Sequence, residues 1–215
     1  MTHDNDLKAA VLEELAWEPS VSAAHIGVAA HNGVVTLTGH VERFSEKQAA
    51  ETAVRRVKGV LAVAEALEVK LPFDVKRSDE DIALAAIDRL AWDTSVPDDA
   101  VKVTVEKGWI TLTGEVAWNF ERVAVEHDVR RLWGVTGVSN HIAIKTRVNL
   151  SNLAAQIDHA LHRSWLDPER VGVTASGGRV KLTGSVDSAS HRDLAASIAW
   201  GAPGATFVDN ELVIS

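Results

Sequence analysis

The sequence contains no cysteine and no tyrosine, and it has a single methionine. Without cysteine the chain can form no disulfide, no thiol nucleophile and no thiolate metal site. No stretch approaches the roughly 18 consecutive apolar residues that a membrane-spanning helix requires. The segment from Met1 to Trp17 lacks the basic start and apolar run of a secretory signal. We therefore expect a cytoplasmic protein.

Positive charge is also scarce. Lys and Arg number 22 against 30 Asp and Glu, so the chain of 215 residues carries a net charge of -8 at pH 7. A nucleic-acid-binding surface needs clustered positive charge to displace counterions from phosphates. We therefore expect no nucleic-acid partner. The remaining composition, 46% hydrophobic and 24% charged, is typical of a globular protein.

One short motif occurs three times along the chain. The segment Val34-Val-Thr-Leu-Thr-Gly-His-Val41 matches residues 109–116 and 179–186, at offsets of 75 and then 70 residues. In every copy a second glycine follows the motif glycine after 20 residues. The repeat glycines are Gly39, Gly114 and Gly184, followed by Gly59, Gly134 and Gly204. This periodicity predicts three tandem modules, at residues 4–72, 78–147 and 149–215.

Each module repeats one order of hydrophobic patterns. Apolar residues at every fourth position predict a first helix. Two alternating stretches then flank a residue pair suited to a two-residue hairpin turn, namely Asn32-Gly33, Lys107-Gly108 and Gly177-Gly178. A second helical pattern follows, which we expect to stop at Gly59 and Gly134, before a final alternating strand. The apolar triplets of the first helices are Leu7, Val11 and Leu15; Ile82, Ala86 and Leu90; and Leu153, Ile157 and Leu161.

The predicted fold class is therefore α+β, with three tandem α-β-β-α-β modules. Each module is expected to form a three-stranded mixed sheet with two helices on one face and the other face open. The linkers, residues 71–77 and 147–149, are too short to act as flexible tethers.

The combination of these patterns with Val/Ile-x-Leu-Thr-Gly-x-Val, a helix before Gly-Val and a closing Val-x-x-x-Ile-x-Ile strand resembles the BON domain, named for bacterial osmotically induced and nodulation proteins. The resemblance covers nearly the whole chain as three copies. It implies α/β modules that bind phospholipid surfaces and serve in envelope maintenance or osmotic stress. Some cytoplasmic members are linked to potassium sensing.

The sequence offers little for chemistry. It contains neither a Gly-x-Ser-x-Gly elbow nor a phosphate-binding glycine-rich loop, so we expect no catalytic residue, no cofactor and no enzyme activity. His159 and His162 are spaced to meet on one helix face, but other metal ligands are not evident, and we expect no metal site. The motif glycines, such as Gly39, either allow close approach of a ligand or mark a bend in the strand; we favour the bend.

Basic residues near the end of the second helix recur in two modules and form the candidate site for lipid or a protein partner. Their charge also complements a helix C-terminus, so a purely structural role is the alternative interpretation. The third copy has Trp200-Gly201 in place of the arginine pair. The candidate residues are Arg55, Arg56 and Lys58 in the first module and Arg130 and Arg131 in the second.

Tryptophans suggest two different roles. Trp17 and Trp92 end the first helices at matching positions, Trp165 falls close to the same place, and we expect all three to pack in the core. Strand alternation instead turns Trp109 away from the helices, onto the open sheet face. An apolar side chain there favours packing of sheet faces between modules or self-association with another chain.

We therefore expect a non-enzymatic binding or scaffolding protein of three BON modules, associated with stress. Its partners would be anionic phospholipid surfaces or proteins, bound through the basic helix ends and Trp109. The alternatives are a cytoplasmic sensor of a small ligand or an ion such as potassium, and a structural module that assembles only with itself.

Overall fold

The computed structural model describes residues 2–72, 76–145, 152–164 and 166–214 of the chain. It contains three modules with the α-β-β-α-β order that the repeat predicts, and each is described by itself. The elements of the first module are α1 (Thr2–Trp17), β1 (Ile26–His31), β2 (Val34–Val41), α2 (Phe44–Arg56) and β3 (Ala62–Val69).

The second and third modules repeat this order. The second contains α3 (Asp79–Trp92), β4 (Val101–Glu106), β5 (Trp109–Val116), α4 (Asn119–Val129) and β6 (Gly137–Ile144). The third contains α5 (Leu153–Leu161), β7 (Val171–Ser176), β8 (Arg179–Val186), α6 (Ala189–Trp200), β9 (Phe207–Asn210) and β10 (Val213–Ile214). The last two strands both pair in parallel with β8, so together they replace the single third strand of the other modules.

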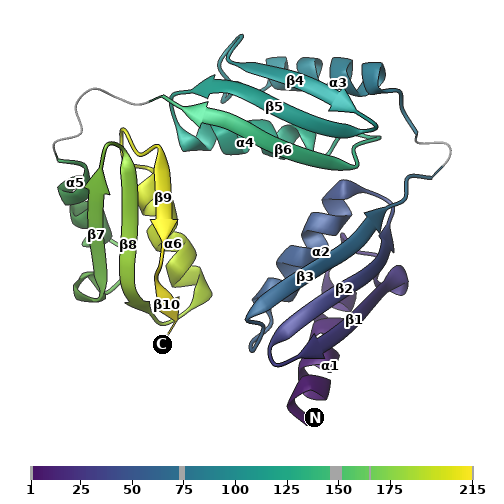
Figure 1. Cartoon of the computed structure of the whole chain (residues 1–215), viewed down its shortest axis with the longest axis horizontal. Helices are drawn as coiled ribbons and strands as arrows, with labels where there is room; N and C mark the ends of the chain where they lie inside the picture. The colour runs from purple at the N-terminus through teal and green to yellow at the C-terminus, as the bar shows by residue number, and fades with distance from the viewer. Residues whose placement is uncertain (1, 73–75, 146–151, 165, 215) are drawn as a thin grey trace. The chain divides into compact units, whose positions relative to one another are not determined.

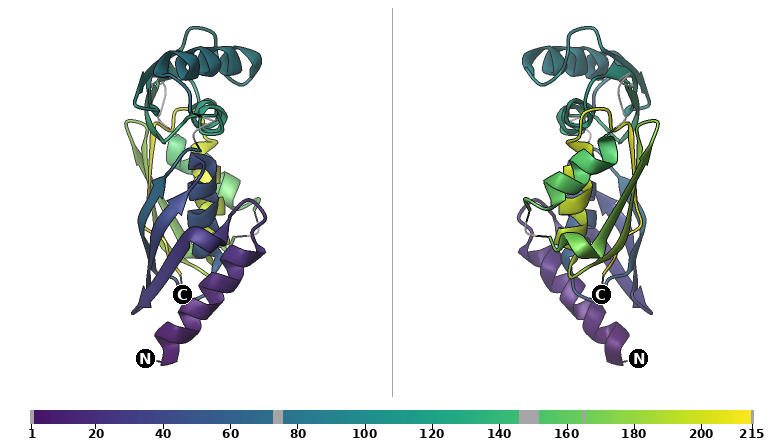
Figure 2. Two further views of the ribbon diagram at one scale, coloured as in Figure 1. Left: turned by 90° about the vertical axis from the view of Figure 1, so that its right-hand side faces the viewer. Right: turned by 90° about the vertical axis from the view of Figure 1, so that its left-hand side faces the viewer.

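Each sheet is mixed. In the first module β1 pairs antiparallel with β2, and β3 pairs with β2 in parallel, with Leu37 opposite both Val28 and Glu65. The parallel pairing follows from the crossover through α2. Both helices lie on one side of this sheet, behind the strands in Figure 1 and to one side of them in Figure 2.

The helix triplets and the inward strand positions form a separate core in each module. All nine triplet residues are buried, as the four-residue spacing predicts. In the first module the triplet packs with residues of all three strands and of α2, including Val28, Leu37 and Val54. The central strands contribute Val35 and Leu37, Ile110 and Leu112, and Val180 and Leu182.

The hairpin turns have the predicted geometry. Asn32 and Gly33 have φ values of 49° and 79°, and the corresponding pairs of the other two modules are also positive at both positions. The first helix fixes the turn through an acidic side chain. Asp79 accepts hydrogen bonds from the backbone N–H groups of Lys107 and Gly108, both at 2.8 Å. Asp4 accepts one from Asn32 in the first module at 2.9 Å.

The second helices end earlier than predicted. We expected them to stop at Gly59 and Gly134, but α2 ends at Arg56 and α4 ends at Val129. Val57 already has an extended backbone, with φ -73° and ψ 127°. The glycine belongs to the turn that follows, where Gly59 has a φ of 95° that is unfavourable for other residues.

Candidate binding surfaces

The arginines at the end of α2 form ion pairs inside the first module. Arg56 contacts Glu14 of α1 at 3.0 Å and Glu18 at 2.8 Å. Arg55 pairs with Glu51 at 2.6 Å, one helical turn earlier. An anionic partner would therefore have to compete with carboxylates that these two guanidinium groups already contact.

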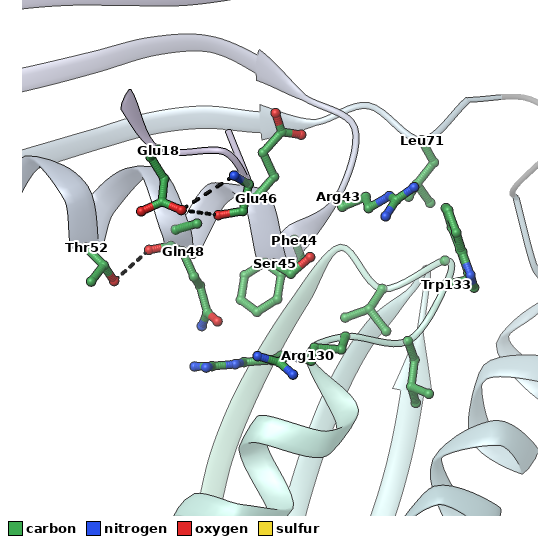
Figure 3. A pocket seen from close by; sticks show the side chains of 16 residues that line it. Glu18, Arg43, Phe44, Ser45, Glu46, Gln48, Thr52, Leu71, Arg130 and Trp133 are labelled. Atoms are coloured by element: carbon green, nitrogen blue, oxygen red, sulfur yellow. Dashed lines mark hydrogen bonds between the residues drawn. The ribbon is translucent and has the colours of Figure 1, made fainter. Parts of the chain in front are cut away.

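The pairing with Glu18 is reinforced by a second donor. The Ser20 hydroxyl donates to Glu18 at 2.7 Å, and the dashed lines beside Glu18 in Figure 3 mark the hydrogen bonds that its carboxylate receives from Ser20. The bonds from Ser20 and then Arg56 lower the pKa of Glu18, and the bond with Glu18 raises the pKa of Arg56. The contact between α1 and α2 is therefore complete at neutral pH and weakens only as the pH falls through the lowered pKa of Glu18.

The basic pair of the second module is placed differently. Since α4 ends at Val129, Arg130 and Arg131 lie in the turn that follows it. Arg131 is exposed, as is Lys58 in the first module. Across residues 2–72, 76–145, 152–164 and 166–214, the structure gives these three side chains no ion pair. They are the positive groups of the candidate site that remain available to an anion.

A buried carboxylate joins the helices of the second module. Asp128 of α4 is 3% exposed and accepts hydrogen bonds from Nε and Nη2 of Arg89 in α3, at 3.1 and 2.8 Å. Both bonds reach Oδ1, and the buried Oδ2 atom has no hydrogen-bond partner. The helix pair is thus bridged by charge in both modules, but the arginine is on the second helix in the first module and on the first helix in the second.

The prediction that the helix-end tryptophans pack in the core is wrong for the two that can be examined. Trp17 is 84% exposed and Trp92 is 86% exposed. Each tryptophan lies two residues beyond the last buried residue of its helix, Leu15 or Leu90. Two residues correspond to a rotation of about 200° around the helix axis, so the tryptophan points away from the core. Trp165 lies outside the described residues.

Trp109 lies on the open face of its sheet, as strand alternation predicts. It is half exposed, while its neighbour Ile110 is fully buried. Its ring covers Gly137 at the start of β6, where a Cβ atom would overlap it. Its Nε1 donates to the hydroxyl of Ser139 at 2.9 Å. The side chain is therefore held flat on the sheet, with one ring face available to a partner.

In every module the first residue of the central strand lies beside a residue of the strand that follows the second helix, and the two residues fit each other. In the first module Val34 lies opposite Ala62. In the third, Arg179 lies opposite Phe207 and stacks on its ring, with 4.1 Å between the guanidinium carbon and the ring centroid. Together with Trp109 over Gly137, these are three chemically different pairs at one place in the fold.

The motif glycines occupy a strand bend that admits no side chain. Gly39, Gly114 and Gly184 have φ values of 112°, 139° and 114°. A Cβ atom at each would overlap the backbone carbonyl oxygen of His25, Ala100 and Arg170, respectively. The close approach of the backbone therefore explains why the motif has glycine at these positions.

The histidine pair is not arranged as a metal site. His159 contacts the Arg163 guanidinium through Nδ1 at 2.5 Å, and His162 lies 3.6 Å from Asp158. Within the part of the chain that the structure describes, no group of three or more His, Asp or Glu residues could hold a metal ion.

The sequence interpretation missed one surface of the second module, formed by the outward side of its two helices and the turn after α4. It carries exposed apolar residues where the other modules have mainly small, polar or charged ones. A signal for this surface is present in the repeat itself: at equivalent positions of the three copies, the second module has the apolar residues. The residues are Leu84, Ile87, Phe120, Val123 and Trp133, with counterparts Ala9, Leu12, Ser45, Gln48 and Lys58 in the first module and Ala155, Asp158, Ser190, Asp193 and Pro203 in the third.

Two of the solved structures that resemble this chain are distant in sequence. A structure of CdsD, described as a structural protein of the Type III secretion system of Chlamydia trachomatis, is 16% identical over 98% of this chain and 92% of that one, with a TM-score of 0.28. A second structure, of the C-terminal domain of CdsD, is 16% identical over 98% of both chains, with a TM-score of 0.27. Among curated proteins no match was found.

None of the helices that the structure describes has the length and apolar character needed to cross a membrane. The model of the BON domain family matches three segments, residues 3–70, 78–146 and 149–215. These segments coincide with the three copies seen in the sequence and in the fold. The chain therefore belongs to the BON domain family and consists of three tandem BON domains.

Proposed function

We propose that the protein is a non-enzymatic scaffold that binds protein partners through the apolar outward side of the helices in its second module. The observation that carries this proposal is the difference between the copies. Phe120 and Val123 are 58% and 53% exposed, whereas Ser45 and Gln48 stand at the same positions of the first module. Clustered exposed apolar side chains commonly mark protein-interaction sites. Aromatic residues frequently contribute most of the binding energy there.

Replacing both residues by their first-module counterparts, Phe120→Ser with Val123→Gln, is expected to abolish partner binding without disturbing the core. The measurement is chemical crosslinking and affinity capture from the native cells, quantified for each captured protein against wild type. We expect the principal partners to fall at least about tenfold, because an interface that loses two central apolar contacts loses over 1.4 kcal/mol.

The matched control is Val213→Thr, which changes an equally exposed apolar residue of the third module, 65% exposed on β10. It should capture the same partners as wild type. Unchanged capture by the double variant, or an equal loss in the control, would contradict the proposal.

A second candidate is binding of anionic phospholipid surfaces, and the unpaired Arg130 and Arg131 favour it. Each arginine near an anionic surface contributes on the order of 1 kcal/mol. We expect Arg130→Ala with Arg131→Ala to weaken binding to phosphatidylglycerol-containing vesicles about 30-fold. Arg55→Ala with Arg56→Ala, whose guanidinium groups are already paired, should have a smaller effect. Co-sedimentation with vesicles measures both, and equal binding by wild type and the Arg130/Arg131 variant would eliminate this candidate.

The stress association and the cytoplasmic location belong to the same proposal and rest on the family resemblance. Neither the stress association nor the location depends on whether the partner is a protein or a phospholipid surface.

A further inference from the structure

A groove runs between α5 and α6 of the third module. Its volume is about 1020 Å³. Leu194 and Ile198, both half-buried on α6, form one wall, and Ala155 and Ala160 on α5 form the other. Pro203, which follows α6, also lines the groove. The groove is thus an apolar trough between two helices, open to solvent.

Among its described residues, this module has no ion pair that bridges the two helices as in the other modules, and the groove lies where those bridges would be. Counting back one residue from the last buried residue of the first helix gives Glu14, Arg89 and Ala160 in the three modules. Glu14 reaches Arg56 and Arg89 reaches Asp128.

The second helices complete the comparison. Counting back six residues from the second repeat glycine gives Asp128 in the second module and Ile198 in the third. Counting back three gives Arg56 in the first module and Gly201 in the third. The third module therefore has alanine, isoleucine and glycine at the positions that carry the bridges, and all three line the groove.

The polar residues that line the groove are two basic ones, His159 and Arg163, and three uncharged ones, Asn152, Gln156 and Ser164. His159 and Arg163 are exposed on the α5 side and contact each other through Nδ1 and Nη1. None of the described residues that line the groove is acidic, although the chain as a whole carries a net charge of -8. Apolar walls with a basic rim suit an amphipathic helix that carries acidic residues beside its apolar stripe.

Such a helix is present in the same chain. On the outward side of α3, Leu84 and Ile87 are 56% and 57% exposed, and Ala91 continues the stripe one turn later. Glu80 and Asp88, both exposed, flank the stripe on the same side of the helix. In the described part of the chain these two carboxylates have no ion pair. We name Leu84, Ile87 and Ala91 the α3 stripe. Its apolar side chains match the apolar walls of the groove, and the carboxylates beside it match the basic residues at the groove.

We propose that the α3 stripe of one copy of this protein docks into the α5–α6 groove of a second copy. The inference rests on the proposed scaffold function and names one of its partners, another chain of the same protein. The two surfaces are different and lie on different modules, so the contact is heterologous. Each docked copy leaves one free stripe and one free groove, and association continues by addition of further copies.

The test is sedimentation of the chain of 215 residues as a function of its concentration. A contact between one helix face and one groove is small and therefore weak. The weight-average mass should thus rise at least about twofold as the protein concentration increases from about 10 µM to about 500 µM. Ala160→Arg with Ile198→Asp installs the Arg89–Asp128 bridge of the second module and fills the groove. Leu84→Ala with Ile87→Asp installs the third-module residues and removes the stripe. Each variant should lower the association constant at least about tenfold.

Mixing the two variants gives the sharpest result. The mixture retains one intact stripe and one intact groove, so it should form a 1:1 dimer and nothing larger. Circular dichroism and thermal melting establish that both variants are folded. A wild-type chain that remains monomeric, or a mixture that does not dimerise, would overturn the inference. If the wild type is monomeric while partner capture still depends on Phe120 and Val123, self-association is wrong and the proposed scaffold function stands.

Discussion

Replacement of Gly184 by alanine is expected to unfold the third module. The residue has a φ of 114°, and the added Cβ would overlap the backbone carbonyl oxygen of Arg170. The overlap is with backbone directly before the neighbouring strand β7, so it cannot be relieved by a rotamer change. We expect a loss of at least about 3 kcal/mol in the free energy of unfolding. A domain of this size is only marginally stable, so such a loss is enough to unfold it.

The control is Gly177→Ala in the same module. Gly177 also has a positive φ, 56°, but a Cβ there would meet no atom within 4 Å. Its cost should be limited to the left-handed backbone, about 1 kcal/mol. Hydrogen exchange measured on peptides of β7 and β8 separates the two, because only Gly184→Ala should remove protection from both strands. Similar exchange in the two variants would show that the steric argument is wrong.

Removal of Arg89 is expected to produce the second largest loss of stability. Among the residues that the structure describes, its guanidinium is the sole hydrogen-bond partner of the Asp128 side chain, which is 3% exposed. Arg89→Ala would leave a buried carboxylate without a counter-charge. We expect the second module to lose about 2–4 kcal/mol.

The third module supplies the rescue. Arg89→Ala with Asp128→Ile reproduces Ala160 and Ile198, which occupy these positions without charge. Because removing both charges avoids the buried unpaired carboxylate, the double variant should unfold within about 1 kcal/mol of wild type. Arg55→Ala, which breaks the exposed pair with Glu51, should cost only about 0.3–0.5 kcal/mol. Urea denaturation measures all three, and a double variant as unstable as Arg89→Ala would refute the explanation.

The fold of each module could be predicted from local signals. The four-residue spacing of Leu7, Val11 and Leu15 determined which side of α1 is buried, and Asn32-Gly33 determined the hairpin turn. These features depend on residues that are close in sequence, where periodicity and backbone preference are informative. Three copies of the pattern made the prediction stronger than a single copy could.

The candidate surfaces were harder to predict because they depend on contacts between distant segments. Arg56 and its partners Glu14 and Glu18 are 42 and 38 residues apart in sequence. Nothing local reveals that its charge is already paired. The exposure of Trp17 was predictable in principle, since the helical spacing from Leu15 points it outward. The apolar character of tryptophan favours the core, but its position on the helix places it in solvent.

The matched residues at the start of the central and edge strands have a consequence for how the copies diverged. A change of Gly137 alone to a larger residue would displace the Trp109 ring. Loss of Phe207 would remove the ring on which the Arg179 guanidinium stacks. Such changes persist more readily as pairs. A duplicated ancestor with three identical sheets could in this way acquire three distinct exteriors, two residues at a time, while its interior stayed the same.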